Sequence, residues 1–256
     1  KGLTPTKKGT LFYEASLKIT DIYQEFLAQA SLLDKTELKS LRIGLPPYMS
    51  MLYSTDLLKN LHSAYPEISF SLCEAYTNDM KEMLFNNQIQ MMVTNEPTQI
   101  KGAVSYPFGG SLSVVIFLRK NSPAAQYAYI KNGCQYLDPI YLEDEPISMT
   151  RAGQSSRELS EAIFEECGVT PRLLQETRHI STLHHYAKEG ITSAIGPETQ
   201  LVRDLDQEEH LIYRIPETYR WSKIRSRIHI LPQINELLPK PMMDIIKNSL
   251  MYEREL

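Results

Sequence analysis

The sequence predicts an α/β fold made of two similar halves, with a long helix ahead of them. The first observation is a strand–helix–strand–helix–strand pattern between residues 41 and 93, which implies a parallel sheet with right-handed crossovers. The second is that residues 112–252 repeat this alternation of short strands and helices. The third is size, because 256 residues with 42% hydrophobic side chains can bury the core of one or two domains.

The first element is a helix, which we place at residues 10–37, with Thr4 or Thr6 as its cap and Pro5 near its first turn. One face carries apolar residues at spacings of three and four positions, which is the heptad-like pattern of a helix that packs against another helix. The members of this apolar stripe are Phe12, Ala15, Ile19, Ile22, Phe26, Ala30 and Leu33. Because no helix or strand pattern precedes it, we expect the stripe to form a dimer contact. The alternative is a helix that lies on its own domain.

The first half of the body is delimited by prolines. Pro46-Pro47 ends the first strand. Tyr65-Pro66 ends the following helix, because the residue before a proline disfavours helical backbone. Thr77 or Asn78 is expected to cap the second helix. The expected elements are a strand at 41–45, a helix at about 50–64, a strand at 68–74, a helix from 77 or 78, and a strand at 89–93.

The second half follows the same rules. Ser155 and Glu158 match a capping box, Ser181 is a candidate cap, and Gly109-Gly110 indicates a hairpin turn. The expected strands are 112–118, 146–149, 172–177, 192–195, 211–215 and 227–231, and the expected helices are 155–167, 182–189 and 241–252. Two Rossmann-like subdomains joined by extended strands enclose a cleft, which is the usual place for a small ligand.

The candidate binding residues lie where strands of such sheets end, because ligands bind beyond the carboxyl ends of parallel strands. They are Pro47, Tyr48, Met49, Ser50, Tyr76, Thr77, Thr94, Asn95, Thr150, Arg151, Ser155, His179 and Ser181. Ser50, Thr77, Ser155 and Ser181 are expected at helix N-termini, whose free N–H groups and dipole favour carboxylates or phosphates. Arg151 can form a bidentate pair with a carboxylate. The alternative is that the hydroxyl residues only cap helices and that Arg151 is solvated.

Several functional classes are disfavoured. The formal net charge of −4 argues against a basic nucleic-acid surface in this region, and no apolar run reaches the roughly 18 residues of a membrane span. The cysteines Cys73, Cys134 and Cys167 form neither a C-x-x-C motif nor a disulfide framework, which favours a cytoplasmic protein.

The search for catalytic and metal sites is negative. The sequence contains no G-x-S-x-G, H-E-x-x-H, P-loop or G-x-G-x-x-G motif, so we do not expect an enzyme. The spacing of His179, His184 and His185 does not make a metal site, and we interpret the adjacent pair as helix-surface histidines. We therefore expect no metal and no other cofactor.

The order of several short stretches resembles one protein family. GLTPTKKG at residues 2–9, ahead of a long helix, resembles the end of the winged helix-turn-helix and the linker helix of LysR-type transcriptional regulators. LRIG at 41–44 and the strand and helix pattern to residue 97 resemble the first regulatory subdomain of that family. SMTRAGQSSRELSEAIFEECGVTP at 148–171 and ETRHISTLHHYAKEGITSAIGP at 176–197 resemble two stretches of the second.

The resemblance implies a periplasmic-binding-protein-like fold (type 2) with a small-molecule effector between the subdomains. It implies a homodimer or homotetramer with paired linker helices, and promoter DNA as the partner of an N-terminal domain of which residues 1–9 are the remnant. The linker is then 10–37, subdomain I is 40–112 with 229–256, and subdomain II is 113–228. No membrane partner is implied.

Two departures from the family pattern bear on the ligand. Thr192 replaces the second glycine of the G-x-G-x-A-x-x-P pattern, and Pro46-Pro47-Tyr48-Met49-Ser50 replaces a loop that often offers small hydroxyl residues. This loop favours an organic anion with an apolar or aromatic part over a small inorganic one. The alternative function is a solute-binding receptor of a transporter with the same two-lobed fold. A transferase on this fold is the third possibility.

Overall fold

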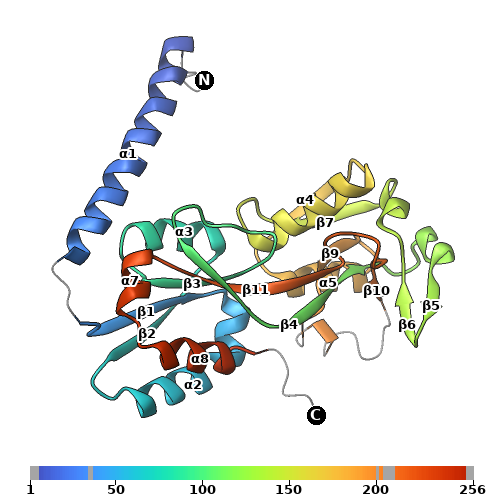
Figure 1. Cartoon of the computed structure of the whole chain (residues 1–256). Helices are drawn as coiled ribbons and strands as arrows, with labels where there is room; N and C mark the ends of the chain where they lie inside the picture. Colours follow the sequence, from blue (N-terminus) through green and yellow to red (C-terminus); the bar gives the residue numbers. More distant parts are fainter. Residues whose placement is uncertain (1–5, 34–36, 200–201, 204–210, 252–256) are drawn as a thin grey trace.

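The computed structural model describes residues 6–33, 37–199, 202–203 and 211–251. The chain opens with α1 (Lys7–Leu33) and continues into two α/β lobes (Figure 1). The first lobe contains β1 (Ser40–Leu45), α2 (Pro47–Ala64), β2 (Ser69–Glu74), α3 (Thr77–Phe85), β3 (Met91–Asn95), α7 (Pro232–Leu237) and α8 (Lys240–Ser249). The predicted two-part α/β fold behind a long helix is therefore confirmed.

The second lobe is built from the middle of the chain. Its strands are β5 (Tyr129–Lys131), β6 (Cys134–Tyr136), β7 (Pro146–Thr150), β8 (Arg172–Thr177), β9 (Ala194–Pro197) and β10 (Ile212–Arg214). Its helices are η1 (Pro123–Tyr127), η2 (Pro139–Leu142), α4 (Ser155–Cys167) and α5 (Ile180–Lys188). In both lobes helices follow strands directly, so several helices begin where strands end.

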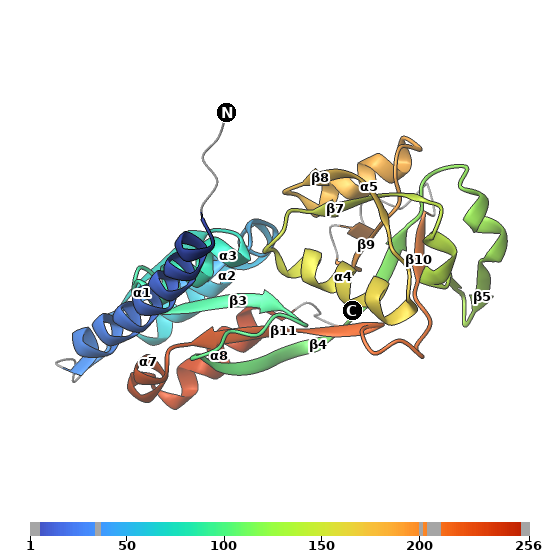
Figure 2. The same ribbon diagram turned by 90° about the horizontal axis from the view of Figure 1, so that it is seen from above.

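Two antiparallel strands, β4 (Val104–Phe117) and β11 (Lys223–Ile230), run from one lobe to the other, as Figure 2 shows from above. The main sheet has the order β2-β1-β3-β11-β4-β10-β6-β5, with β9 also paired to β4. β1 is parallel to β2 and β3, while β11 is antiparallel to β3 and β4. β7 and β8 form a separate parallel pair. The subdomain boundaries at 112/113 and 228/229 stay a prediction.

The glycines Gly109 and Gly110 do not form the predicted hairpin turn, because both lie inside the 14-residue strand β4. Phe108 pairs with Ser226 and Leu112 pairs with Ile224, so three residues of β4 face one residue of β11. Such a bulge bends a strand, and Gly109 adopts the positive φ of 68° that glycine accepts most easily. The irregularity lies where β4 passes from the first lobe to the second.

Each lobe has its own apolar core. The first is formed by residues that include Ile43, Leu57, Met80 and Ile228, all 0% exposed. The second gathers around Phe164 and Ile163 of α4 and Val114 of β4. Because β4 and β11 contribute side chains to both cores, the crossing strands join the two lobes.

The apolar stripe of α1 is exposed to solvent. Figure 1 shows the N-terminal part of α1 projecting away from the two lobes, although α1 also contacts α3 and α7 of the first lobe. The side chains of Phe12, Ile19, Ile22 and Phe26 are between 60% and 75% exposed. The N–H of Gly9 donates to Oγ1 of Thr6 at 3.1 Å, which caps the start of the helix as expected. Ala15 lies on the same exposed helix, whereas the side chains of Ala30 and Leu33 lie outside the described residues.

Candidate functional site

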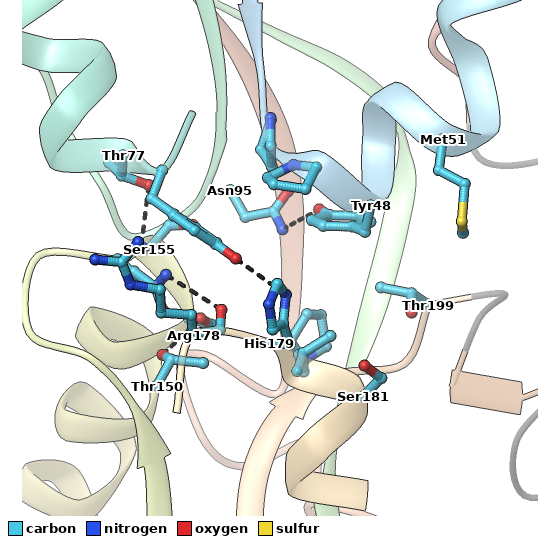
Figure 3. A pocket seen from close by; sticks show the side chains of 17 residues that line it. Tyr48, Met51, Thr77, Asn95, Thr150, Ser155, Arg178, His179, Ser181 and Thr199 are labelled. Atoms are coloured by element: carbon cyan, nitrogen blue, oxygen red, sulfur yellow. Dashed lines mark hydrogen bonds between the residues drawn. The ribbon is translucent and has the colours of Figure 1, made fainter. Parts of the chain in front are cut away.

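A cavity of about 240 Å³ lies between the two lobes (Figure 3). The first lobe contributes Pro46, Pro47, Tyr48, Met51, Tyr76, Thr77 and Asn95. The second lobe contributes Thr150, Gln154, Ser155, Ser156, Arg178, His179, Ile180, Ser181, Pro197 and Thr199. The wall therefore depends on both lobes, and any molecule that fills the cavity contacts both.

Four helices begin at this wall. The residues that precede α2, α3, α4 and α5 are Pro46, Tyr76, Gln154 and His179, and all four line the cavity. None of them caps its helix with a side chain. Helix N-termini carry unpaired N–H groups and a partial positive charge, so their convergence makes the cavity favourable for an anion.

The charged side chains in and near the cavity also favour an anion. Arg178 lines the cavity, and no carboxylate is present among the described lining residues. Glu96 follows β3, but both of its oxygens are directed to β11, where they accept from Arg227 and from the N–H of Arg225. A carboxylate that could repel an anion is thus held away from the cavity.

One part of the wall is apolar. Pro46, Pro47, Met51, Ile180 and Pro197 supply hydrocarbon surface, and the Met51 side chain is 64% exposed. Proline and methionine surfaces bind apolar groups through burial without demanding hydrogen bonds. The cavity therefore suits a molecule with one charged end and one apolar part.

The polar side chains of the floor are fixed by hydrogen bonds. Asn95 donates through Nδ2 to the Tyr48 hydroxyl at 3.0 Å and accepts at Oδ1 from Oγ of Ser226 at 2.9 Å. Thr150 Oγ1 lies 2.7 Å from Oγ of Ser156. These bonds hold the groups in place before a ligand binds, which lowers the ordering cost of binding.

One hydrogen bond crosses the cavity between the lobes. The Tyr76 hydroxyl lies 3.0 Å from Nδ1 of His179 (Figure 3). Burial raises the pKa of Tyr76, while the nearby positive charge of Arg178 opposes this shift. The phenol therefore stays protonated at neutral pH, and it donates to His179 when that ring carries its proton on Nε2.

The structure brings nine of the predicted site residues to the cavity wall. They are Pro47, Tyr48, Tyr76, Thr77, Asn95, Thr150, Ser155, His179 and Ser181. Met49, Ser50, Thr94 and Arg151 do not line it.

The reasons differ for the four residues outside. Met49 is 0% exposed in the core of the first lobe, and Ser50 donates to Oε1 of Glu74 at 2.7 Å. Thr94 points to the face of β3 opposite Asn95, because side chains alternate along a strand; its Oγ1 lies 2.7 Å from Nε2 of His229. Arg151 is exposed, and its backbone N–H bonds to the carbonyl of Thr177.

Eight lining residues are not among the individual site residues predicted from the sequence, although Gln154 and Ile180 lie in the loops 150–155 and 179–181 that were expected to face the cleft. The eight are Pro46, Met51, Gln154, Ser156, Arg178, Ile180, Pro197 and Thr199. Arg178 follows the end of β8, Pro197 is the last residue of β9 and Thr199 comes shortly after it, so the rule that ligands bind beyond strand ends could have found them. Met51 gave no such signal, because its position on α2 fits a core-facing residue equally well.

Several helix-related expectations were wrong. Thr77 or Asn78 does not cap α3 and Ser181 does not cap α5, because Tyr76 and His179 precede these helices. Ser155 does not cap α4: Gln154 precedes the helix, and Glu158 bonds to Lys81 and Thr98 of the first lobe instead of to the N–H of Ser155. His184 is not on the helix surface but is 0% exposed beside Phe117, whereas His185 is exposed. Within the described residues no group of three His, Cys, Asp or Glu side chains is arranged to hold a metal ion.

Comparison with known proteins identifies the architecture. A family model described as "LysR substrate binding domain" matches residues 35–232. A search of curated proteins gives no match. Of the helices that the structure describes, none combines the length and the apolar character needed to cross a membrane.

Solved structures with the same fold include regulators. A full-length OxyR variant from Pseudomonas aeruginosa is 13% identical, with a TM-score of 0.58 over 96% of this chain and 80% of that one. The CcmR regulatory domain of Synechocystis PCC6803, solved in complex with 2-PG, is 18% identical, with a TM-score of 0.61 over 82% of this chain and 95% of that one. HinK from Pseudomonas aeruginosa, a LysR family transcriptional regulator, is 15% identical, with a TM-score of 0.61 over 96% of this chain and 79% of that one.

Proposed function

Because the chain belongs to the LysR substrate binding domain family, we propose that it is the effector-sensing and oligomerisation region of a transcriptional regulator. Its effector is a small organic anion that binds in the cavity between the lobes. The observation that carries this proposal is the convergence of four helix N-termini, none of them capped by the side chain of the residue that precedes the helix, on a cavity lined by Arg178. As a sensor, the chain performs no chemistry on its effector.

The chemical class of the effector follows from the two kinds of wall. The helix N-termini and Arg178 suit a carboxylate or phosphate, and an arginine can hold such a group with two parallel hydrogen bonds. The surface around Pro47, Met51 and Pro197 suits an apolar or aromatic part. Small aromatic or branched carboxylic acids combine both, and the roughly 240 Å³ cavity has room for a molecule of that size.

The proposed signal is a change in the angle between lobes or between subunits. A ligand shifts such an equilibrium only when it binds one state better than the other. A molecule that contacts both lobes meets this condition, because separating the lobes removes its contacts with one of them. In the proposed full-length protein, the change alters the spacing of N-terminal domains on promoter DNA in the cytoplasm.

The proposed oligomer uses the apolar stripe of α1. Phe12, Ile19, Ile22 and Phe26 form one exposed face, and apolar residues at heptad-like spacing are typical of paired helices. A homodimer or homotetramer held through α1 places two or more sensing regions in one molecule.

The effector site is tested with a matched pair of arginine variants, Arg178→Gln and Arg151→Gln. Thermal-shift measurements on the parent use benzoate, phenylacetate, 2-phospholactate and short branched carboxylates as probes. For the acid that stabilises the parent most, we expect Arg178→Gln to weaken binding by about 10- to 100-fold, because a charge-assisted hydrogen bond contributes about 1.5–3 kcal/mol. Arg151→Gln should bind within about twofold of the parent, since Arg151 does not line the cavity.

Two outcomes contradict the proposal. One is equal weakening in both variants, which indicates a general charge effect and not a site at Arg178. The other is that no acid in the panel stabilises the parent while neutral compounds of the same shape do.

A further inference from the structure

The two lobes also contact each other beside the cavity, where the start of α3 meets the start of α4. We propose that this contact, called the seam here, locks the lobes in the closed arrangement and couples closure to effector binding. The seam consists of Thr77, Asn78, Lys81 and Thr98 of the first lobe with Gly153, Ser155 and Glu158 of the second. The lock is a property of the fold itself, whereas its coupling to the effector rests on the function proposed above.

The first part of the seam is a hydrogen bond between helices of different lobes. Ser155 is the first residue of α4, so its N–H has no acceptor within the helix. That N–H donates to Oγ1 of Thr77 at 3.2 Å, and Thr77 is only 3% exposed. The first lobe therefore completes the hydrogen bonding of a helix in the second, and opening the lobes breaks this bond.

The second part is a close packing contact between Gly153 and the Asn78 side chain. Gly153 has a φ of 85°, and a Cβ placed on it would overlap Nδ2 and Cγ of Asn78. Asn78 is the second residue of α3, so any side chain at position 153 meets the opposite lobe. A side chain at position 153 therefore has to displace the exposed Asn78 side chain or move the two lobes apart.

The third part is an ionic contact. Nζ of Lys81 lies 3.5 Å from Oε1 of Glu158, and Thr98 donates its hydroxyl to Oε2 of the same carboxylate. Thr98 is 1% exposed, so its hydrogen bond is shielded from solvent. An exposed ion pair alone contributes little, but the buried hydroxyl adds a directional contact that is lost when the lobes separate.

The seam and the cavity share residues. Thr77 and Ser155 line the cavity as well as bonding to each other, and Tyr76 and His179 bond across it next to them. A ligand that contacts these residues binds the closed state in preference. If the closed fraction falls, the apparent affinity falls by the same factor.

The test compares two glycine variants, one near each end of α4. Gly153→Ala inserts a methyl group into the seam. Gly168, just after the C-terminal end of α4, has a similar φ of 72°, but a Cβ added there would have nothing within 4 Å. Gly168→Ala therefore reproduces the backbone strain without a clash against the other lobe. Thr98→Val is a second way to weaken the seam that leaves both glycines and the cavity wall intact.

The measurement is hydrogen exchange at the Ser155 amide of the 256-residue chain without any ligand, resolved by NMR or by fragmentation mass spectrometry. In the parent, we expect this amide to exchange at least about tenfold more slowly than that of Ser156, for which no acceptor is found among the described residues. Gly153→Ala should raise the Ser155 rate at least about fivefold and Thr98→Val by a smaller factor, while Gly168→Ala leaves it unchanged relative to Ser156.

Two results overturn the lock: rapid exchange of Ser155 in the parent, or equal acceleration by the two glycine variants. These results need no ligand, so they leave the proposed function standing. The coupling is measured by repeating the benzoate and phenylacetate titrations. A Gly153→Ala protein that opens the seam yet binds the acids as tightly as Gly168→Ala overturns the coupling. If no variant binds an acid while the Ser155 amide still exchanges slowly, the result counts against the proposed function and leaves the lock standing.

Discussion

Substituting Ile19 and Ile22 by glutamate is expected to convert the oligomer into monomers without unfolding the lobes. Both side chains are about two-thirds exposed, at 67% and 66%, on the same face of α1 as Phe12 and Phe26. Burying an isoleucine fully contributes about 1.5–3 kcal/mol, and two subunits lose two such side chains each. Placing carboxylates in the contact adds a desolvation cost. We expect the dissociation constant of the dimer to rise at least about 1,000-fold.

Sedimentation equilibrium measures this effect directly. The control is Thr10→Glu with Lys18→Gln, which changes the formal charge by the same −2 on positions of α1 outside the stripe. The control should keep the oligomeric mass of the parent, and both proteins should keep its melting temperature when extrapolated to low concentration. An Ile19→Glu/Ile22→Glu protein with the parent's mass would show that the stripe is not the contact.

Acidification is expected to destabilise the protein through His229, a buried histidine that joins three strands. Its Nε2 lies 2.7 Å from Oγ1 of Thr94 on β3, and its Nδ1 lies 2.7 Å from Oγ of Ser105 on β4. The side chain is 0% exposed. Burial, with a smaller contribution from the charges of Arg227 and Lys81, lowers the pKa of His229 from 6.5 to about 4.

The direction of the pH effect follows from proton binding in the two states. Between pH 6.5 and 4 the unfolded chain protonates His229 while the folded chain does not, so stability is lost as the pH falls through this interval. The difference between the two pKa values corresponds to about 3 kcal/mol.

Urea unfolding at pH 7.0 and pH 4.5 checks this result with His229→Gln and, as control, His185→Gln, whose histidine is exposed. Removing His229 also changes stability at neutral pH. The measured quantity is therefore the decrease in the free energy of unfolding from pH 7.0 to pH 4.5 within each protein. That loss should be about 2–3 kcal/mol smaller for His229→Gln than for the parent, and nearly equal to the parent for His185→Gln. Equal losses in all three would mean that the pKa of His229 is the same in the folded and the unfolded chain.

The order of strands and helices could be predicted because local patterns decide it. Alternating apolar residues mark strands such as 69–74, and Pro46-Pro47 marks a boundary regardless of the rest of the fold. Even here α2 begins at Pro47 and not at Ser50, because proline fits the first turn of a helix without losing a hydrogen bond.

Features that depend on distant parts of the chain could not be predicted. Glu158 fits a local capping box, but its position opposite Lys81 and Thr98 gives it better partners in the other lobe. The glycines at 109 and 110 indicate a turn locally, but pairing with β11 on both sides of them makes β4 one strand with a bulge at this point. Arg151 and Arg178 both follow strand ends, and only the packing of the second lobe decides that Arg178 reaches the cavity.

The most direct measurement of the central claim compares an acid with its neutral ester in the same cavity. Isothermal titration of the parent with the tightest-binding acid of the panel and with its methyl ester isolates the contribution of the negative charge. If the helix N-termini and Arg178 form an anion site, the acid binds at least about 30-fold more tightly, and this preference shrinks to about threefold in Arg178→Gln. Equal affinities of acid and ester for the parent would contradict the claim that this cavity senses an organic anion.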